Sequence, residues 1–169
     1  HTPGEEMAQV SPDNLPELLF EDILHLEDAR EEHGLMCEVF RKIVGRQDAV
    51  LQISELLGEA FLLEAARHEF VHALCAISRW SNLKAFEEEL KRLPPEELKY
   101  FALTGASHLP IIIPPLPNLM FTRDVAAVVG HSIMLSHPAN AARARESIVM
   151  RVVVQHHPAF SAVREQIIH

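Results

Sequence analysis

The feature that most restricts the fold is a run of about fifty helical residues between two segments that contain strand patterns. From Ser54 to Gly105 the apolar residues recur at helical spacing, which predicts helices at about 55–64, 66–79, 82–92 and 95–104. The pair Pro94-Pro95 favours the start of the last helix, and Gly105 favours its end. We therefore expect a small helical bundle here, without strands.

The flanking segments predict helices mixed with strands. Before the bundle, apolar spacing predicts a helix from about Leu24 to Val44, "DAVLQI" predicts a short strand, and Ser54 then caps the next helix. After Gly105, "LPIIIP" predicts a strand, "VAAVV" and "IMLS" predict a hairpin, and "NAARARESIVMRVVVQHH" predicts a helix that stops at Pro158. The predicted class is α/β with a helical insertion. The predicted parts are residues 1–53, 54–105 and 106–169.

Composition limits the classes of partner. The chain has 169 residues, of which 48% are hydrophobic and 23% charged, as is ordinary for a domain with its own core. Its formal net charge of -9 argues against a nucleic acid and against an anionic membrane surface. No apolar run approaches the roughly 20 residues that span a bilayer. We expect neither nucleic acid nor membrane as a partner.

The two cysteines and the chain ends give further expectations. Cys37 and Cys75 both lie in helical patterns and do not form a disulfide framework, so a reducing cytoplasm is expected. No cationic neighbour lowers the pKa of Cys37, and Cys75 has only His72 one turn earlier, so we expect both thiols to pack. The chain begins at His1 without a signal segment and ends within a continuing pattern. We expect it to be a piece of a longer protein.

The run "HEFVH", from His68 to His72, fits the zinc motif H-E-x-x-H. On a helix this spacing places two imidazoles on one face, where both can bind zinc and the intervening Glu can act as a base. The extended motif fails, because Cys75 and Ser78 stand where Gly and a third His are required. A Glu ligand from Glu87 to Glu89 stays open. A zinc metallopeptidase is thus an alternative, but we favour a partly solvated helix face and expect no metal.

The stretch "PPLPNLMFTRD", followed by "ARARE", is the most specific pattern in the chain. It resembles the signature of arginine deiminase, a guanidine-modifying member of the pentein superfamily: Pro-x-Pro-Asn-x-x-Phe-x-Arg-Asp, a hairpin, an Ala-Arg-x-x-Glu helix start and His-Pro. Here the matching residues are Pro115, Pro117, Asn118, Phe121, Arg123, Asp124, Ala142, Arg143, Glu146, His157 and Pro158.

The resemblance extends to the N-terminal segments. "HTPG" is similar to the family's His-x-Pro-Gly, and "SPDNLPELLFEDI" to its Pro-x-Asn-Leu-x-Glu-Leu-Leu-Phe-x-Asp segment. The helical bundle lies where arginine deiminases carry an inserted helical domain. The implied fold is the first part of a pentein α/β propeller of ββαβ-type blades, with the bundle inserted.

The resemblance also implies a chemistry and a site. In the family a Cys thiolate attacks the guanidinium carbon of L-arginine, ammonia leaves, and water releases L-citrulline. Asp124 resembles a catalytic carboxylate that binds the guanidinium, and Arg143 the residue that binds the α-carboxylate. Asn118 and Phe121 resemble pocket-lining residues, and Arg123 is expected to be structural, as a partner of a buried carboxylate.

The catalytic Cys, the catalytic His and a second carboxylate would lie beyond this segment, so the implied role is that of an N-terminal part that is inactive alone. A guanidino substrate, no cofactor and a homo-oligomer are expected. The alternatives are a related amidinotransferase or arginine dihydrolase, and a non-catalytic helical interaction module.

Overall fold

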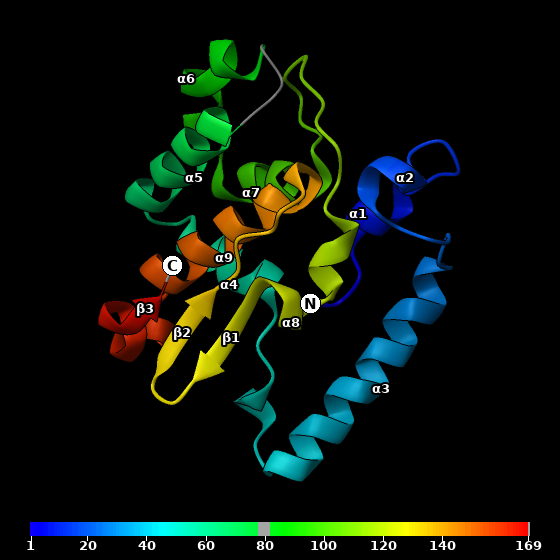
Figure 1. The fold of residues 1–169 in the computed structure, drawn as a ribbon, viewed down its shortest axis with the longest axis vertical. Coiled ribbons are helices and arrows are strands. Elements are labelled where there is room, and N and C mark those ends of the chain that lie inside the picture. Colours follow the sequence, from blue (N-terminus) through cyan, green and yellow to red (C-terminus); the bar gives the residue numbers. More distant parts are fainter. Residues whose placement is uncertain (78–81, 169) are drawn as a thin grey trace.

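Helices make up most of this computed structural model, which describes residues 1–77 and 82–168 (Figure 1). The helices are α1 (Glu5–Ala8), α2 (Leu15–Leu18), α3 (Leu26–Val44), α4 (Ile53–Ala60), α5 (Glu64–Ile77), α6 (Glu87–Lys91), α7 (Pro95–Thr104), α8 (Thr122–Val125) and α9 (Ala144–His156). The strands are β1 (Ala126–Val129), β2 (Ser132–Leu135) and β3 (Ile167–Ile168). Short 3-10 segments are η1 (Gln47–Ala49), η2 (Leu83–Phe86), η3 (Pro117–Met120), η4 (Ala141–Arg143) and η5 (Pro158–Gln166).

The long helical patterns are confirmed. The helix predicted at 24–44 is α3, and the predicted bundle contains α4, α5, α6 and α7. As predicted, α7 follows Pro94 and ends at Gly105, which has a left-handed φ of +77° that glycine adopts without strain. The predicted helix boundary at residue 79 lies outside the described residues.

Two strand predictions are wrong. The run "DAVLQI" forms the 3-10 turn η1 and then α4, whose N-cap is Gln52 instead of the expected Ser54. The side chain of Gln52 is engaged elsewhere, because it accepts the Thr2 N–H at 2.8 Å. The run "LPIIIP" forms only an isolated bridge, between Ala106 and Ile112, because its neighbour is the end of α7 and not another strand.

The predicted hairpin and the helix after it are confirmed. β1 and β2 pair antiparallel from Ala126↔Leu135 to Val129↔Ser132, and β3 adds parallel to β2. Gly130, with φ +62°, supplies the left-handed residue that a two-residue hairpin turn requires. The helix that follows the hairpin is α9, and it ends just before Pro158.

The main core joins the bundle to the segment that follows it. α9 packs on α4 and α5 and completely buries Val149, Val152 and Val153 among their apolar side chains. Within the bundle, the rings of Phe61 and Phe70 meet edge to face at 5.2 Å between centroids. The bundle and α9 therefore share one hydrophobic core, which fixes the start of α9 in space.

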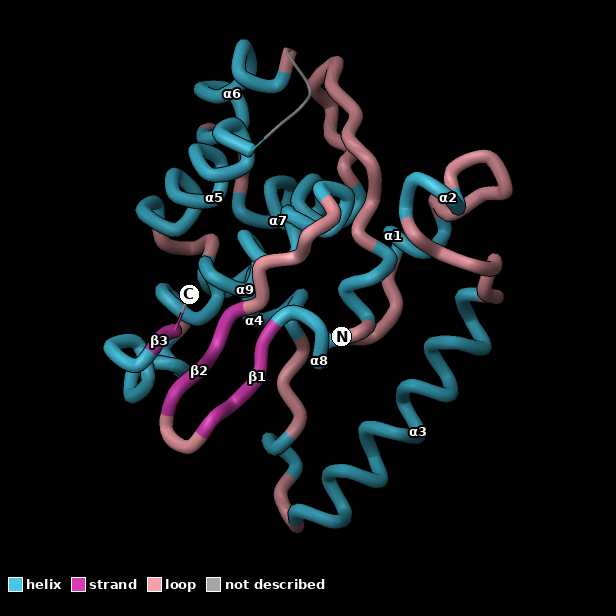
Figure 2. The backbone as a smooth tube through the Cα atoms, viewed as in Figure 1, coloured by secondary structure: helices cyan, strands magenta, loops and turns pink. Residues whose placement is uncertain are grey.

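The sheet is small compared with the helical part, as Figure 2 shows. In the described residues one mixed sheet has the order β1-β2-β3. The described residues are mostly helical and do not form a propeller. No helix within residues 1–77 and 82–168 has both the length and the apolarity required to cross a bilayer.

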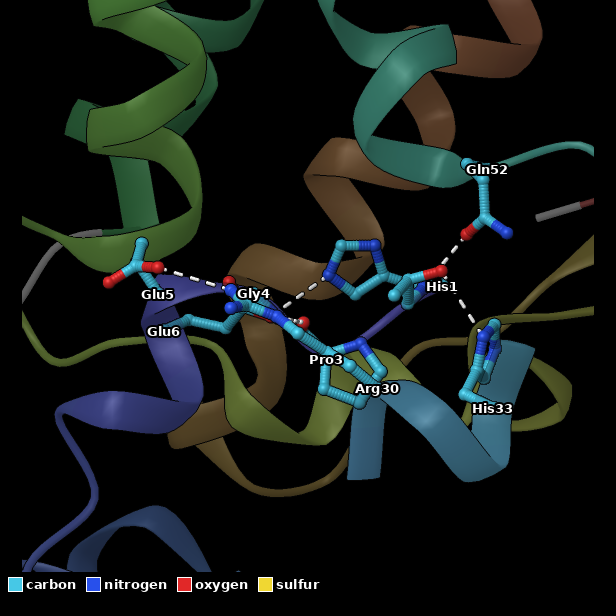
Figure 3. A network of polar contacts seen from close by, with 9 residues as sticks. His1, Pro3, Gly4, Glu5, Glu6, Arg30, His33 and Gln52 are labelled. Atoms are coloured by element: carbon cyan, nitrogen blue, oxygen red, sulfur yellow. Dashed lines mark hydrogen bonds and ion pairs between the residues drawn. The ribbon is translucent and has the colours of Figure 1, made fainter. Parts of the chain in front are cut away.

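A buried carboxylate organises the N-terminal segment (Figure 3). Glu6 is 2% exposed, and its Oε1 lies 3.0 Å from Nε2 of His1 and accepts the Gly4 N–H at 2.7 Å. Burial raises the pKa of Glu6, but the hydrogen bond and charge of His1, together with backbone N–H groups, outweigh it and lower the pKa. Arg30 of α3 donates to the Pro3 carbonyl at 2.9 Å and so attaches α3 to this segment.

Candidate functional site

A one-turn helix presents Asp124 at the start of the hairpin. The proline-rich run before it ends in η3, and α8 then carries Asp124 with its N–H donating to the Phe121 carbonyl at 2.9 Å. The next residue, Val125, is buried in the core. A buried residue directly after an exposed carboxylate fixes the backbone while the side chain stays accessible, and 49% of the Asp124 side chain is exposed.

Arg143 brings a guanidinium to this carboxylate from the start of α9. Its Nη1 lies 2.9 Å from Oδ2 of Asp124. Its Nε lies 3.1 and 3.0 Å from the two carboxylate oxygens of Glu146, and its Nη2 lies 2.8 Å from Oε2 of Glu146. Glu146 is one helical turn further along, so its carboxylate faces Arg143 across the first turn of α9. One guanidinium therefore bridges an exposed and a buried carboxylate.

Burial shifts the pKa values of the charged groups on the inner side of the site, where Arg143 meets Glu146. Hydrogen bonding to Glu146, and then to Asp124, raises the pKa of Arg143 although partial burial opposes it. Burial raises the pKa of Glu146, and the contact with Arg143 only partly offsets this. Burial also lowers the pKa of Arg145 to about 9, and its guanidinium donates to the Pro114 carbonyl. The site thus has buried charged groups, Glu146 and Arg145, on its inner side and an exposed carboxylate, Asp124, at its edge.

The exposed edge opens on a hollow of about 320 Å³. Its lining residues are Asp124, Val125, Ser136, His137, Pro138, Ala139, Asn140, Arg143, Glu146 and Ser147. A space of this size is at the lower end of small-molecule sites. Sequence reasoning missed His137, Asn140 and Ser147, which come from the β2–α9 connection and the first turns of α9. The sequence analysis assigned no role to Glu146. The signal for one was its position three residues after Arg143 at the start of a helix, a spacing at which oppositely charged side chains pair.

The other predicted site residues lie away from this hollow. Asn118 is buried, and its Nδ2 donates to the Leu18 carbonyl at 2.5 Å, which ties η3 to the end of α2. Phe121 is 47% exposed, and its ring lies 6.4 Å from that of Phe20. Neither is among the residues that line the hollow. The structure therefore brings Asp124 and Arg143 together and places the other two beside the backbone that carries Asp124.

The prediction that Arg123 pairs with a buried carboxylate is not supported. Arg123 is exposed, and no ion pair of its side chain occurs in the described part of the chain. Asp124 and the buried Glu146 both pair with Arg143 instead.

The histidines of "HEFVH" do not converge. Nε2 of His68 lies 3.5 Å from Glu64, and Nδ1 of His72 lies 3.6 Å from Glu87. The intervening Glu69 points to α9, where its Oε2 is 2.8 Å from Nε2 of His156. Within residues 1–77 and 82–168, no three His, Cys, Asp or Glu side chains gather as metal ligands would. The motif acts here as a set of helix-surface and inter-helix ion pairs.

The thiols do not have the surroundings of nucleophiles. Cys37 is buried, with its Sγ 3.4 Å from Nδ1 of His33. Burial, and then the charge of Glu87, raise the pKa of the Cys75 thiol. Since the thiolate is the reactive form, Cys75 is a poor nucleophile, and Cys37, which is 4% exposed, is closed to a substrate.

Comparison with known proteins adds the family. The sequence model described as "Arginine deiminase" matches residues 81–169. The arginine deiminases of Staphylococcus aureus strains JH9, Newman and Mu3 are each 34% identical to the chain over 179 residues, covering 94% of the chain and 43% of their own length. The chain thus spans less than half the length of these curated relatives. The family match extends over more than half of the chain and confirms the resemblance seen in the sequence: this chain belongs to the arginine deiminase family.

Proposed function

We propose that the chain is the N-terminal part of an enzyme that converts L-arginine and water to L-citrulline and ammonia. In this proposal Asp124 binds the guanidinium of the substrate, and Arg143 binds its α-carboxylate. The observation that carries it is the guanidinium of Arg143 on Asp124, with Nη1 and Oδ2 2.9 Å apart at the edge of an open hollow. The carboxylate is therefore accessible to a planar N–H donor group of the substrate's kind.

The reaction assigns separate tasks to the two parts of the parent protein. A thiolate from the other part forms a bond to the guanidinium carbon, a C–N bond breaks, and the nitrogen leaves as ammonia after protonation. Water then adds to the resulting thiouronium carbon, and citrulline and the thiolate separate. Asp124 contributes by orienting the carbon and by compensating the positive charge of the bound substrate. Asn118 and Phe121 support the wall that carries Asp124.

The architecture of the parent protein is part of the same proposal. Residues 1–53 and 106–169 would form the first part of a pentein propeller, and residues 54–105 would be its helical insertion. The support is the family membership together with the hairpin and small mixed sheet that follow the bundle. The exposed first strand β1 is then an edge on which further sheet can form.

The test compares the full-length parent with the 169-residue chain. With L-arginine, the parent should release citrulline and ammonia in a one-to-one ratio, and the 169-residue chain should release neither. Ornithine with two equivalents of ammonia would instead identify an arginine dihydrolase. Turnover by the 169-residue chain that is lost in Cys75→Ser would show that the nucleophile has been misplaced.

A further inference from the structure

The contact between Asp124 and Arg143 is too close for both to bind the two ends of one substrate. In an extended L-arginine about 7 Å separates the guanidinium carbon from the carboxylate carbon, because six bonds of about 1.5 Å join them. In the structure Nη1 of Arg143 lies 2.9 Å from Oδ2 of Asp124. An arginine bound at both ends therefore requires the two side chains to separate.

We infer that Arg143 is a resident guanidinium on Asp124, and that the substrate must displace it before it binds. The inference rests on the proposed function, in which both side chains contact the substrate. The contact is autoinhibitory, because the carboxylate that receives the ligand's guanidinium is already paired with one of the same chemistry. The substrate replaces this guanidinium with its own.

The contacts of Arg143 indicate which of its two ion pairs breaks. Its pair with Glu146 has three N–O distances between 2.8 and 3.1 Å, and the Glu146 side chain is 3% exposed. Its pair with Asp124 has a single contact, and the Asp124 side chain is 49% exposed. Breaking a buried pair leaves a charge without a partner, whereas exposed pairs are weak. Arg143 therefore stays on Glu146 and releases Asp124.

Release gives the site a way to discriminate between ligands. Once Nη1 leaves Asp124, it is a donor held in place by Glu146 and available for a carboxylate. A guanidine with an α-carboxylate restores a partner to both Asp124 and Arg143. A guanidine without an α-carboxylate displaces Arg143 but provides no new partner for it. The apparent affinity of such a ligand is therefore reduced in proportion to the fraction of molecules in which Asp124 is free.

The experiment measures binding of methylguanidine, which has no carboxylate, to the full-length parent by NMR titration. Arg143→Ala should lower the dissociation constant of methylguanidine by about two- to fivefold, the range expected for loss of an exposed ion pair. The same variant should raise KM for L-arginine. Tighter binding of methylguanidine together with a higher KM for L-arginine is the result expected if Arg143 occupies Asp124 in the free enzyme.

Arg123→Ala is the matched control, because it removes the same charge beside Asp124 from an exposed side chain that forms no ion pair with Asp124 in the described residues. It should leave the methylguanidine dissociation constant unchanged. An equal decrease in both variants, or no decrease in Arg143→Ala, would overturn the inference. If Arg143→Ala does not fold, because Glu146 is left buried without a partner, the double variant Arg143→Ala/Glu146→Gln is measured in its place.

The two proposals fail separately. If the wild-type parent does not turn over L-arginine, the proposed function fails, whatever the titration shows. If it turns over L-arginine but methylguanidine binds no better to the variant, the resident guanidinium alone is disproved. Because the titration does not depend on turnover, each outcome is decisive for one of them.

Discussion

At the scale of single residues, the buried Glu146 determines where Arg143 can be. It contacts Arg143 through both of its carboxylate oxygens, while Arg145, whose charge burial disfavours, follows Arg143 by two residues. Because burial disfavours its charged form, the Glu146 carboxylate is sensitive to pH. Protonation of Glu146 therefore removes a charge that holds Arg143 in place.

The pH dependence of substrate binding follows from this. Burial raises the pKa of Glu146 above its ordinary value, so as the pH falls Glu146 is protonated earlier than an exposed carboxyl would be. Protonation removes the charge that positions Arg143. In the full-length parent, KM for L-arginine should rise as the pH falls through this raised pKa. Glu146→Gln should have a high KM, about tenfold above wild type, and no such pH dependence. An unchanged acid limb in that variant would assign the titration to another group.

The pairing of Asp124 with Arg143 could be predicted only in part. Nineteen positions separate the two residues, and no periodicity connects them. Resemblance to a family signature selected both residues, but their direct contact depends on how the hairpin folds back onto α9. Glu146 was in the same signature, and its role required knowledge of its burial. Long-range pairs of this kind are determined by tertiary packing, which local patterns do not contain.

At the scale of secondary-structure elements, long periodic patterns were reliable and short apolar runs were not. The patterns of α3 and of the bundle extend over many residues, so their period is unambiguous. In "LPIIIP" the alternation is real, since Ile111 and Ile113 are 2% exposed and Ile112 is 81% exposed. The segment has no neighbouring strand to pair with among the described residues, and the local sequence pattern does not show whether such a strand is present. Pairing partners decide whether such a run is a strand.

Gly105 gives a direct test of how α7 ends. Its φ is +77°, and a Cβ there would collide with the carbonyl oxygen of Ile113. Gly105→Ala should lower the free energy of unfolding by about 1–3 kcal/mol, measured by thermal or denaturant unfolding of the 169-residue chain. Gly34→Ala is the control: it lies within α3, where an added Cβ meets no atom within 4 Å. It should stabilise by about 0.5–1 kcal/mol. Equal effects of the two would contradict the assigned backbone strain.

The N-terminal network should make stability depend on acid pH. The pKa of Glu6 is lowered in the folded chain, so its contribution is fully present above its unfolded pKa and is lost as the pH falls through the folded pKa. Glu6→Gln should cost about 1.5–3 kcal/mol at neutral pH and flatten this acid loss. Glu5→Gln should cost no more than about 1 kcal/mol, because its pair with Arg30 is largely exposed. Denaturant unfolding at several pH values measures both variants, and similar curves would disprove the role of Glu6.

At the scale of the whole molecule, much of the apolar surface of α3 is exposed. The exposed large hydrophobic residues on this helix are Leu35, Met36, Val39, Phe40, Ile43 and Val44. Figure 1 shows α3 at one edge of the molecule, away from the bundle. The chain spans 43% of the length of its curated relatives. In the proposed longer parent, we expect the additional polypeptide to cover this apolar surface of α3.

Ile43, which is 75% exposed, tests whether the rest of the parent covers this face. Ile43→Glu should leave the melting temperature of the 169-residue chain nearly unchanged, because the new charge stays in water. In the full-length parent the same change should lower stability by at least about 2 kcal/mol, because the charge would be buried without a partner. Equal melting shifts in the two proteins would show that α3 remains exposed in the parent.

The most direct test of the whole account is kcat/KM of Asp124→Ala in the full-length parent, measured beside its thermal melting. Removing the carboxylate leaves the substrate cation underpaired and the carbon poorly oriented for attack. We predict a fall in kcat/KM of at least about a thousandfold, roughly 4 kcal/mol, with a melting temperature near that of wild type. A lower melting temperature with intact kcat/KM would contradict the account, since Asp124 would then serve only to hold Arg143 and the start of the hairpin.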